Sequence, residues 1–153
     1  MAGLSSSGED GFLEDFKAIG KLSGQSVEAG WFDEQGEHPT AGMSYPELAL
    51  YHAQGRNGVT PRDVLGLAGA IYPPDKDRVV LKAIGDWLEN PKVNSIDNLL
   101  DIIGANSVNK IQSLFGSAML HRTPMNPDPL IDTGALREAT SYQTSKSTSI
   151  KGT

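Results

Sequence analysis

The sequence predicts an α+β domain in which a small mixed or antiparallel sheet packs against several helices. Most of its 153 residues fall in segments whose apolar side chains recur at helical spacing, and two shorter stretches, 25–33 and 140–145, are typical of strands. A chain of this length can form one domain with a core of its own. We expect that domain over residues 12–145, between small, polar and flexible arms at 1–11 and 146–153.

The composition argues against several classes of protein. The chain has no cysteine, so it can form neither a disulfide nor a thiolate metal site. No apolar run reaches the roughly 18 residues that span a bilayer, and residues 1–10 lack the basic and apolar regions of a signal peptide. The net charge is −6, without a cluster of Lys and Arg that would bind nucleic-acid phosphates. A negative net charge without a basic cluster suits a protein that binds other proteins, or a surface past which DNA slides without being bound.

The N-terminal part is expected to contain a short amphipathic helix followed by a strand. Phe12, Phe16 and Ile19 recur at helical spacing, which predicts a helix over about residues 9–21. Residues 25–33 alternate between two faces, as the side chains of a strand do.

After a loop over residues 33–43, the next helix is expected to begin at Ser44. Serine is a favoured N-cap residue, and Glu47 three positions later completes a capping box. Gly55 is expected to end this helix. A short apolar segment that reaches Ile71 follows.

Two further helices are expected in the second half of the chain. The first covers about residues 75–89 and stops at Asn90-Pro91. Its apolar face comprises Val80, Leu81, Ile84, Trp87 and Leu88. Ser95 is the expected N-cap of the second, in which Gly104 is a site for a kink or a break. Residues 140–145 then predict an edge strand.

The stretch 129–137 contains Asp132-Thr133-Gly134, which looks like the active-site turn of an aspartic protease. Such an enzyme needs two carboxylates about 3 Å apart, so this chain would have to act as a homodimer. Only a Ser-, Thr- and Lys-rich segment follows Gly134, whereas the protease fold needs further apolar strands. In the structural interpretation, Asp132 or Thr133 accepts a backbone N–H, Gly134 takes a positive φ and Leu136 enters the core. We favour this interpretation, because an isolated tripeptide match is weak.

Two arginines are candidate interface residues. Arg62 follows a proline and Arg137 follows the glycine-containing turn. An arginine in such a turn can pair bidentately with a carboxylate on a neighbouring chain. A solvated surface arginine, by contrast, contributes less than about 1 kcal/mol. The sequence leaves both interpretations open for Arg62 and Arg137.

Apart from the Asp132-Thr133-Gly134 turn, nothing in the sequence predicts an enzyme, and nothing predicts a cofactor or a metal site. His38, His52 and His121 lie far apart and form no pair with metal-ligand spacing, and His52 is expected to be a partly buried polar residue. The chain has no phosphate-binding loop and no nucleophile elbow. Trp31 and Trp87 are expected in the core, because no basic residues are interleaved with the aromatic ones as in a nucleic-acid stacking surface.

Four short phrases follow one another in a particular order. Residues 27–32 look like a Val-x-Val-Gly-Phe strand, residues 47–55 like a helix that ends in His-Glu-Phe-Gly, and residues 60–65 like Pro-x-Arg-Pro-Phe-Leu. Residues 129–137 match Pro-Leu-Ile-Asp-Thr-Gly-x-Leu-Arg. In this order the phrases resemble the neck and tail-completion family of tailed bacteriophages, over roughly residues 25–145. The second and third phrases depart from the family pattern at Ala53-Gln54 and at Asp63-Val64.

The resemblance implies a structural virion protein without catalytic activity. Its α+β subunits would form a homo-oligomeric ring in the neck or collar, as a head–tail connector or tail terminator, with DNA passing through the lumen. A hexamer is the first expectation and a dodecamer the second. The partners implied are other copies of the chain, neighbouring neck proteins, portal or adaptor proteins and tail proteins, after assembly in the host cytoplasm.

The same resemblance gives the terminal segments and the 140–145 strand a role in assembly. The arms would order on neighbouring subunits, and the 140–145 strand would add to another sheet. The candidate interface residues are Arg62, Asp132, Thr133, Gly134, Leu136 and Arg137.

Overall fold

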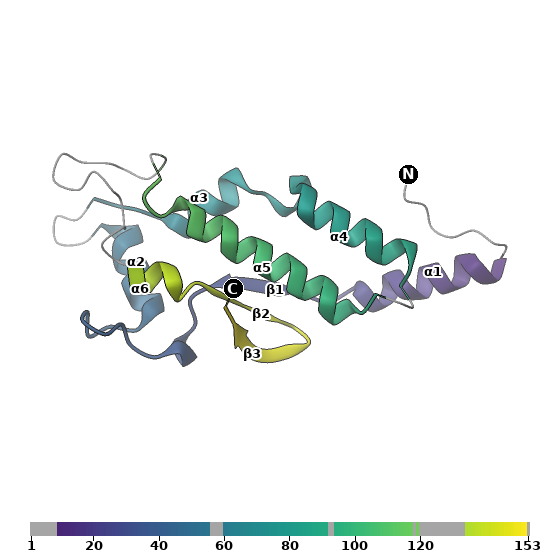
Figure 1. Ribbon diagram of the computed structural model, residues 1–153, viewed down its shortest axis with the longest axis horizontal. Helices are drawn as coiled ribbons and strands as arrows, with labels where there is room; N and C mark the ends of the chain where they lie inside the picture. Colours follow the sequence, from purple (N-terminus) through teal and green to yellow (C-terminus); the bar gives the residue numbers. More distant parts are fainter. Residues whose placement is uncertain (1–8, 56–59, 92–93, 118, 120–133, 153) are drawn as a thin grey trace.

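The computed structural model describes residues 9–55, 60–91, 94–117, 119 and 134–152, and it confirms the α+β class (Figure 1). The helices are α1 (Glu9–Leu22), α2 (Tyr45–Gln54), α3 (Val64–Ile71), α4 (Arg78–Glu89), α5 (Ile96–Leu114) and α6 (Gly134–Glu138). Two 3-10 turns are η1 (Asp33–Gln35) and η3 (Pro74–Lys76), and the strands are β1 (Val27–Gly30), β2 (Ser141–Thr144) and β3 (Ser147–Lys151).

The long helix α5 lies between α4 and the sheet and contacts both (Figure 1). Near its N-terminus, Leu99 packs with Trp87 and Ala83 of α4. Near its C-terminus, Ile111 and Leu114 pack with side chains from α2, α3 and α6 in a second core cluster. Because α5 takes part in both clusters, burial of its two ends joins the two halves of the domain.

The three strands form an antiparallel sheet in the order β1-β2-β3. Val27 pairs with Thr144 and Gly30 with Ser141, so β1 and β2 align over four residues. The prediction of an edge strand at 140–145 is wrong, because β2 is hydrogen-bonded on both sides. Its backbone groups are therefore already used within the chain, and this strand cannot add to another sheet.

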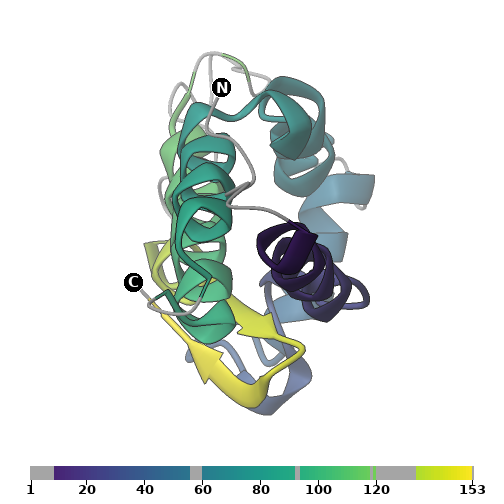
Figure 2. The same cartoon turned by 90° about the vertical axis from the view of Figure 1, so that its right-hand side faces the viewer.

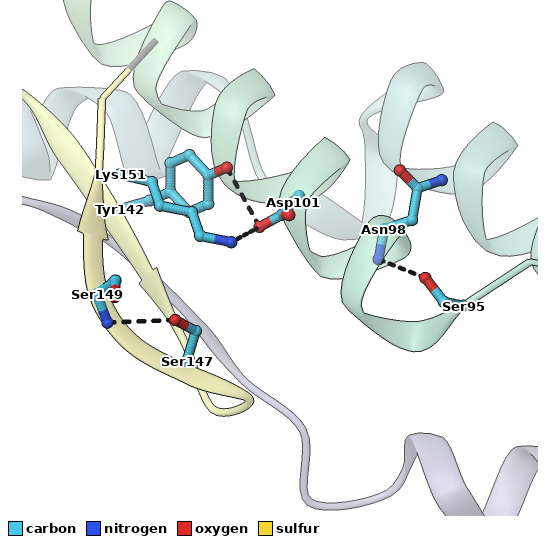
Figure 3. A network of polar contacts seen from close by, with 7 residues as sticks. All are labelled: Ser95, Asn98, Asp101, Tyr142, Ser147, Ser149 and Lys151. Carbon is cyan, nitrogen blue, oxygen red and sulfur yellow. Dashed lines mark hydrogen bonds and ion pairs between the residues drawn. The ribbon is translucent and has the colours of Figure 1, made fainter.

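The C-terminal segment is also different from the expectation. Residues 146–153 were expected to be a flexible tail, but residues Ser147–Lys151 form β3. Figure 3 shows the contact that accompanies this pairing: Asp101 of α5 accepts hydrogen bonds from Tyr142 (3.3 Å) and from the Lys151 ammonium (2.8 Å). Burial raises the pKa of Tyr142, and the neighbouring Asp101 carboxylate raises it further, so the phenol stays protonated and donates.

Local capping signals are confirmed where the sequence predicts them. The Ser44 hydroxyl accepts from the Glu47 amide (3.4 Å), and the Glu47 carboxylate accepts from the Ser44 amide (2.9 Å). Gly55 ends α2 in the left-handed conformation, at φ 64°. Ser95 accepts from the amide of Asn98 (3.0 Å) at the start of α5 (Figure 3). Each cap involves residues no more than four positions apart.

Several predicted boundaries and faces need correction. The N-terminal arm is shorter than 1–11, because α1 begins at Glu9. The helix expected from residue 75 begins at Arg78, after the 3-10 turn η3, with Asp77 as its N-cap. Leu81 was expected on the buried face of that helix but is 50% exposed, and Ala83 is buried there instead.

Gly104 does not kink α5, which continues without a break from Ile96 to Leu114. The glycine is buried against the aromatic ring of Tyr142, and a Cβ atom at this position would overlap that ring. Its role is therefore to let β2 approach the helix closely.

Replacement of Gly104 by Ala is expected to destabilise the protein by about 1–3 kcal/mol, because Tyr142 is buried and has to move. Gly69→Ala in α3 is the matched control, since an added Cβ meets nothing within 4 Å there. The control is expected to stabilise the helix by up to about 1 kcal/mol. Urea unfolding followed by circular dichroism measures both, and equal stability of the two variants would contradict this close packing.

Candidate functional site

An apolar groove of about 330 Å³ lies between α2 and the segment that leads into α3. We call it the α2–α3 groove. Its lining includes Leu50 and His52 from α2, residues 62–65, Trp31 and Leu136. Of the residues that line it, Leu50 is 53% exposed, whereas Leu136 is almost fully buried. The groove is thus open to solvent and largely hydrophobic, which suits a protein or small-molecule partner with an apolar surface.

Backbone and capping hydrogen bonds hold Arg62 and Asp63, which lead into α3. The amide of Arg62 donates to the carbonyl of His52 in α2 (2.7 Å). The Asp63 carboxylate accepts from the amide of Gly66 (2.9 Å) and so caps α3. The Asp63 carboxylate therefore lies at the N-terminal, positive end of the α3 dipole and also lines the groove.

The base of the groove depends on a hydrogen bond between distant parts of the sequence. The indole Nε1 of Trp31 donates to the carbonyl of Leu136 (2.7 Å). The same indole packs edge-on against Phe115, with ring centroids 6.2 Å apart. These contacts hold the start of the C-terminal segment against the end of β1.

The short helix α6 is held by side chains at its C-terminal end. Gln112 of α5 donates to the carbonyl of Arg137 (3.1 Å), and Gln35 of η1 donates to the carbonyl of Ala139. The hydroxyl of Thr140, which is fully buried, donates to the carbonyl of Leu136 (3.4 Å). Side chains therefore satisfy the carbonyls that a helix end leaves without intrahelical partners.

The groove contains a buried cation and a neutral imidazole. The Arg62 side chain is only 5% exposed, and its Nη1 donates to the carbonyl of Thr60 (3.4 Å). Burial lowers the pKa of His52, and the positive charge of Arg62 lowers it further. The Nδ1 atom of His52 is buried and has no hydrogen-bond partner among the described residues. The polar groups of the groove thus comprise a buried cation, an imidazole that is neutral at pH 7 and the Asp63 carboxylate.

The structure brings together two of the candidate residues identified in the sequence. Arg62 and Leu136 line the same groove, although they lie far apart in the chain. Leu136 enters the core, as predicted. The burial of Arg62 overturns its interpretation as a solvated surface side chain. Pairing of Arg62 with a neighbouring chain stays a prediction.

The other candidates lie at or before α6. Gly134 was expected to have a positive φ, but it is the first residue of the helix and its φ is not positive. Arg137 is exposed on α6, which leaves both of its sequence interpretations open. Asp132 and Thr133 lie outside the described residues, as does the rest of the 120–133 stretch.

Neither the groove nor the part that Trp31 takes in it was predicted from the sequence. Trp31 was assigned to the core, but it is half-buried and its polar edge fixes α6. His52 is partly buried, as predicted. One signal was present in the sequence: the four family-like phrases at 27–32, 47–55, 60–65 and 129–137 each contribute at least one residue to the groove.

Within residues 9–55, 60–91, 94–117, 119 and 134–152, no three His, Asp or Glu side chains gather in a way that could hold a metal ion. Among the helices described, none is both long and apolar enough to cross a bilayer.

Acidification is expected to destabilise the protein through His52. Because the folded-state pKa is lowered, the unfolded chain takes up the proton first, near its usual pKa of about 6.5. The stabilising contribution is therefore complete above about pH 6.5 and is lost as the pH falls toward the lower folded-state pKa. Urea unfolding at pH 7.5 and 5.5 measures the change in the free energy of unfolding. Between these two pH values, the His52→Gln variant is expected to lose less stability than the native chain. An equal loss in both proteins would show that His52 does not titrate in this way.

Comparison with known proteins gives no family assignment. No protein-family model matches the chain, and no curated protein or solved structure is significantly similar to it. The function is therefore inferred from the groove and from the order of the four sequence phrases.

Proposed function

We propose that this chain is a self-associating structural subunit of a tailed bacteriophage, in a ring at the head–tail junction. The observation that carries the proposal is the convergence of the four family-like phrases on one surface. Trp31, His52, Arg62 and Leu136, one from each phrase, all line the α2–α3 groove. Because these phrases are scattered over the sequence, a shared contact surface explains why they occur together.

The groove also favours binding over catalysis. Its lining is mostly apolar, and two of its polar members are engaged within the chain: Trp31 donates to Leu136, and Asp63 caps α3. A surface of this kind buries a partner's side chains, which is how identical subunits join head to tail until a ring closes. In the proposed ring the copies are six or, second, twelve, and the neighbours are portal or adaptor, neck and tail proteins.

The charge of the chain fits a ring through which DNA passes. The net charge is −6 and the lysines and arginines form no cluster in the sequence. An acidic lumen repels phosphates, so DNA would move through it without being held. The negative charge therefore supports a channel through which DNA passes, rather than a protein that binds nucleic acid.

The proposal predicts that the purified chain forms closed rings and that phage lacking it accumulate unjoined heads and tails. Light scattering gives the number of copies, and negative-stain electron microscopy shows ring closure and the particles. Asp132→Asn is expected to leave both assembly and particle production intact. A chain that stays monomeric while particles assemble without it would contradict the proposal. Proteolysis that is lost in Asp132→Asn would instead support the homodimeric aspartic protease.

A further inference from the structure

A second pocket lies where α3 leads through η3 into α4, and we call it the η3–α4 pocket. Figures 1 and 2 show this turn at the top of the molecule and the sheet at the bottom. The pocket has a volume of about 270 Å³, and its polar lining comprises Tyr72, Lys76, Asp77, Arg78 and Lys110. Because a water molecule takes up about 30 Å³ of the liquid, the pocket has room for a small anion and several waters.

The η3–α4 pocket brings together three cations from two parts of the chain. Lys76 and Arg78 come from η3 and the start of α4 and are exposed, whereas Lys110 comes from α5 and is half-buried. The Nζ atom of Lys110 lies 4.6 Å from the centroid of the Tyr72 ring, and this cation–π contact holds the ammonium at the pocket. Within the described part of the chain, none of the three cations forms an ion pair. The ion pairs described there, Lys82–Asp86 and Lys151–Asp101, involve other side chains.

One carboxylate, that of Asp77, also lines the pocket, but both of its oxygens already accept hydrogen bonds. One oxygen accepts from the amides of Val79 (2.8 Å) and Val80 (3.3 Å), and the other accepts from the Asn106 side chain (3.0 Å). The Asn106 hydrogen bond, the two amide hydrogen bonds and the charge of Lys110 lower the pKa of Asp77, so the group is ionised at pH 7. The lining therefore carries three positive charges against one negative charge, in a chain whose net charge is −6.

This local excess of two positive charges matches a phosphate group. Cations that are held together without a counter-ion repel one another, and a bound anion removes that repulsion. At neutral pH a phosphate group carries a charge of about −1.5 to −2 and three strong acceptor oxygens. Lysine and arginine are the side chains that bind phosphate in proteins, and arginine can do so with two parallel hydrogen bonds.

The net charge of the chain favours a small phosphate ligand over a polyanion. A small ligand lies within a Debye length of the three cations, which is about 10 Å at 0.1 M salt. A long polyanion such as DNA also experiences the repulsion of the acidic remainder of the chain.

We propose that the η3–α4 pocket binds the phosphate group of a small ligand through Lys76, Arg78 and Lys110. This inference goes beyond the proposed ring and does not depend on it.

Titration of the nitrogen-15-labelled chain with inorganic phosphate, followed by NMR, tests the proposal. Chloride is exchanged for phosphate at constant ionic strength, so that general screening stays the same. The expected result is a set of amide shifts that saturate and that are concentrated at residues 71–79 and around Lys110. Shifts that rise without saturation or that are spread over the whole chain would overturn the proposal.

Three variants, each of which removes one positive charge, assign the binding to the pocket. Arg78→Gln and Lys110→Gln are each expected to weaken phosphate binding by about tenfold, because each removes a hydrogen bond to a charged group. Lys82→Gln is the matched control on α4, since Lys82 pairs with Asp86 and does not line the pocket. It is expected to leave the affinity nearly unchanged. Circular dichroism checks that all three variants are folded, and equal affinities in the three would contradict the proposed site.

A short DNA duplex, followed by fluorescence polarisation at the same ionic strength, distinguishes the source of the phosphate. The duplex is expected not to bind. Binding that is lost in Arg78→Gln would assign the pocket to a nucleic-acid backbone, and it would overturn both the small ligand and the proposed passage of DNA without binding. Rings that form from a chain without affinity for phosphate would overturn the phosphate site alone and leave the ring in place.

Discussion

The hydrogen bond from the Trp31 indole to the carbonyl of Leu136 is the contact on which the α2–α3 groove depends. It joins residues 105 positions apart and fixes where the C-terminal segment meets β1. Leu136 can then fill the core between α2, α3 and α5, and its buried side chain forms the base of the groove. Without this bond, a buried carbonyl would lose a partner and the packing around Phe115 would change.

The helix α6 shows how the surrounding structure stabilises a segment that is too short to be stable alone. An isolated helix of five residues does not form in water, because its nucleation is unfavourable. Here Trp31, Gln35 and Gln112, from three different parts of the chain, donate to the carbonyls of residues 136, 139 and 137, respectively. The helix and its position are therefore consequences of the tertiary structure.

The two ends of the molecule present different surfaces. One end presents an acidic, amphipathic helix, and the other presents an apolar groove with the buried charge of Arg62. In the proposed ring, unlike surfaces of neighbouring copies would meet head to tail, and such contacts close into a ring when the rotation per subunit allows it. The sheet takes no part through its middle strand, because β2 is already paired on both sides.

The sequence by itself determined the α+β class, the caps at Ser44 and Ser95 and the left-handed end of α2 at Gly55, because these features depend on residues within about one helical turn. Only the tertiary structure decided that residues 147–151 form a strand, that Gly104 faces an aromatic ring and that Arg62 is buried. Strand pairing, close approach and burial depend on partners dozens of residues away, and no local pattern specifies those partners.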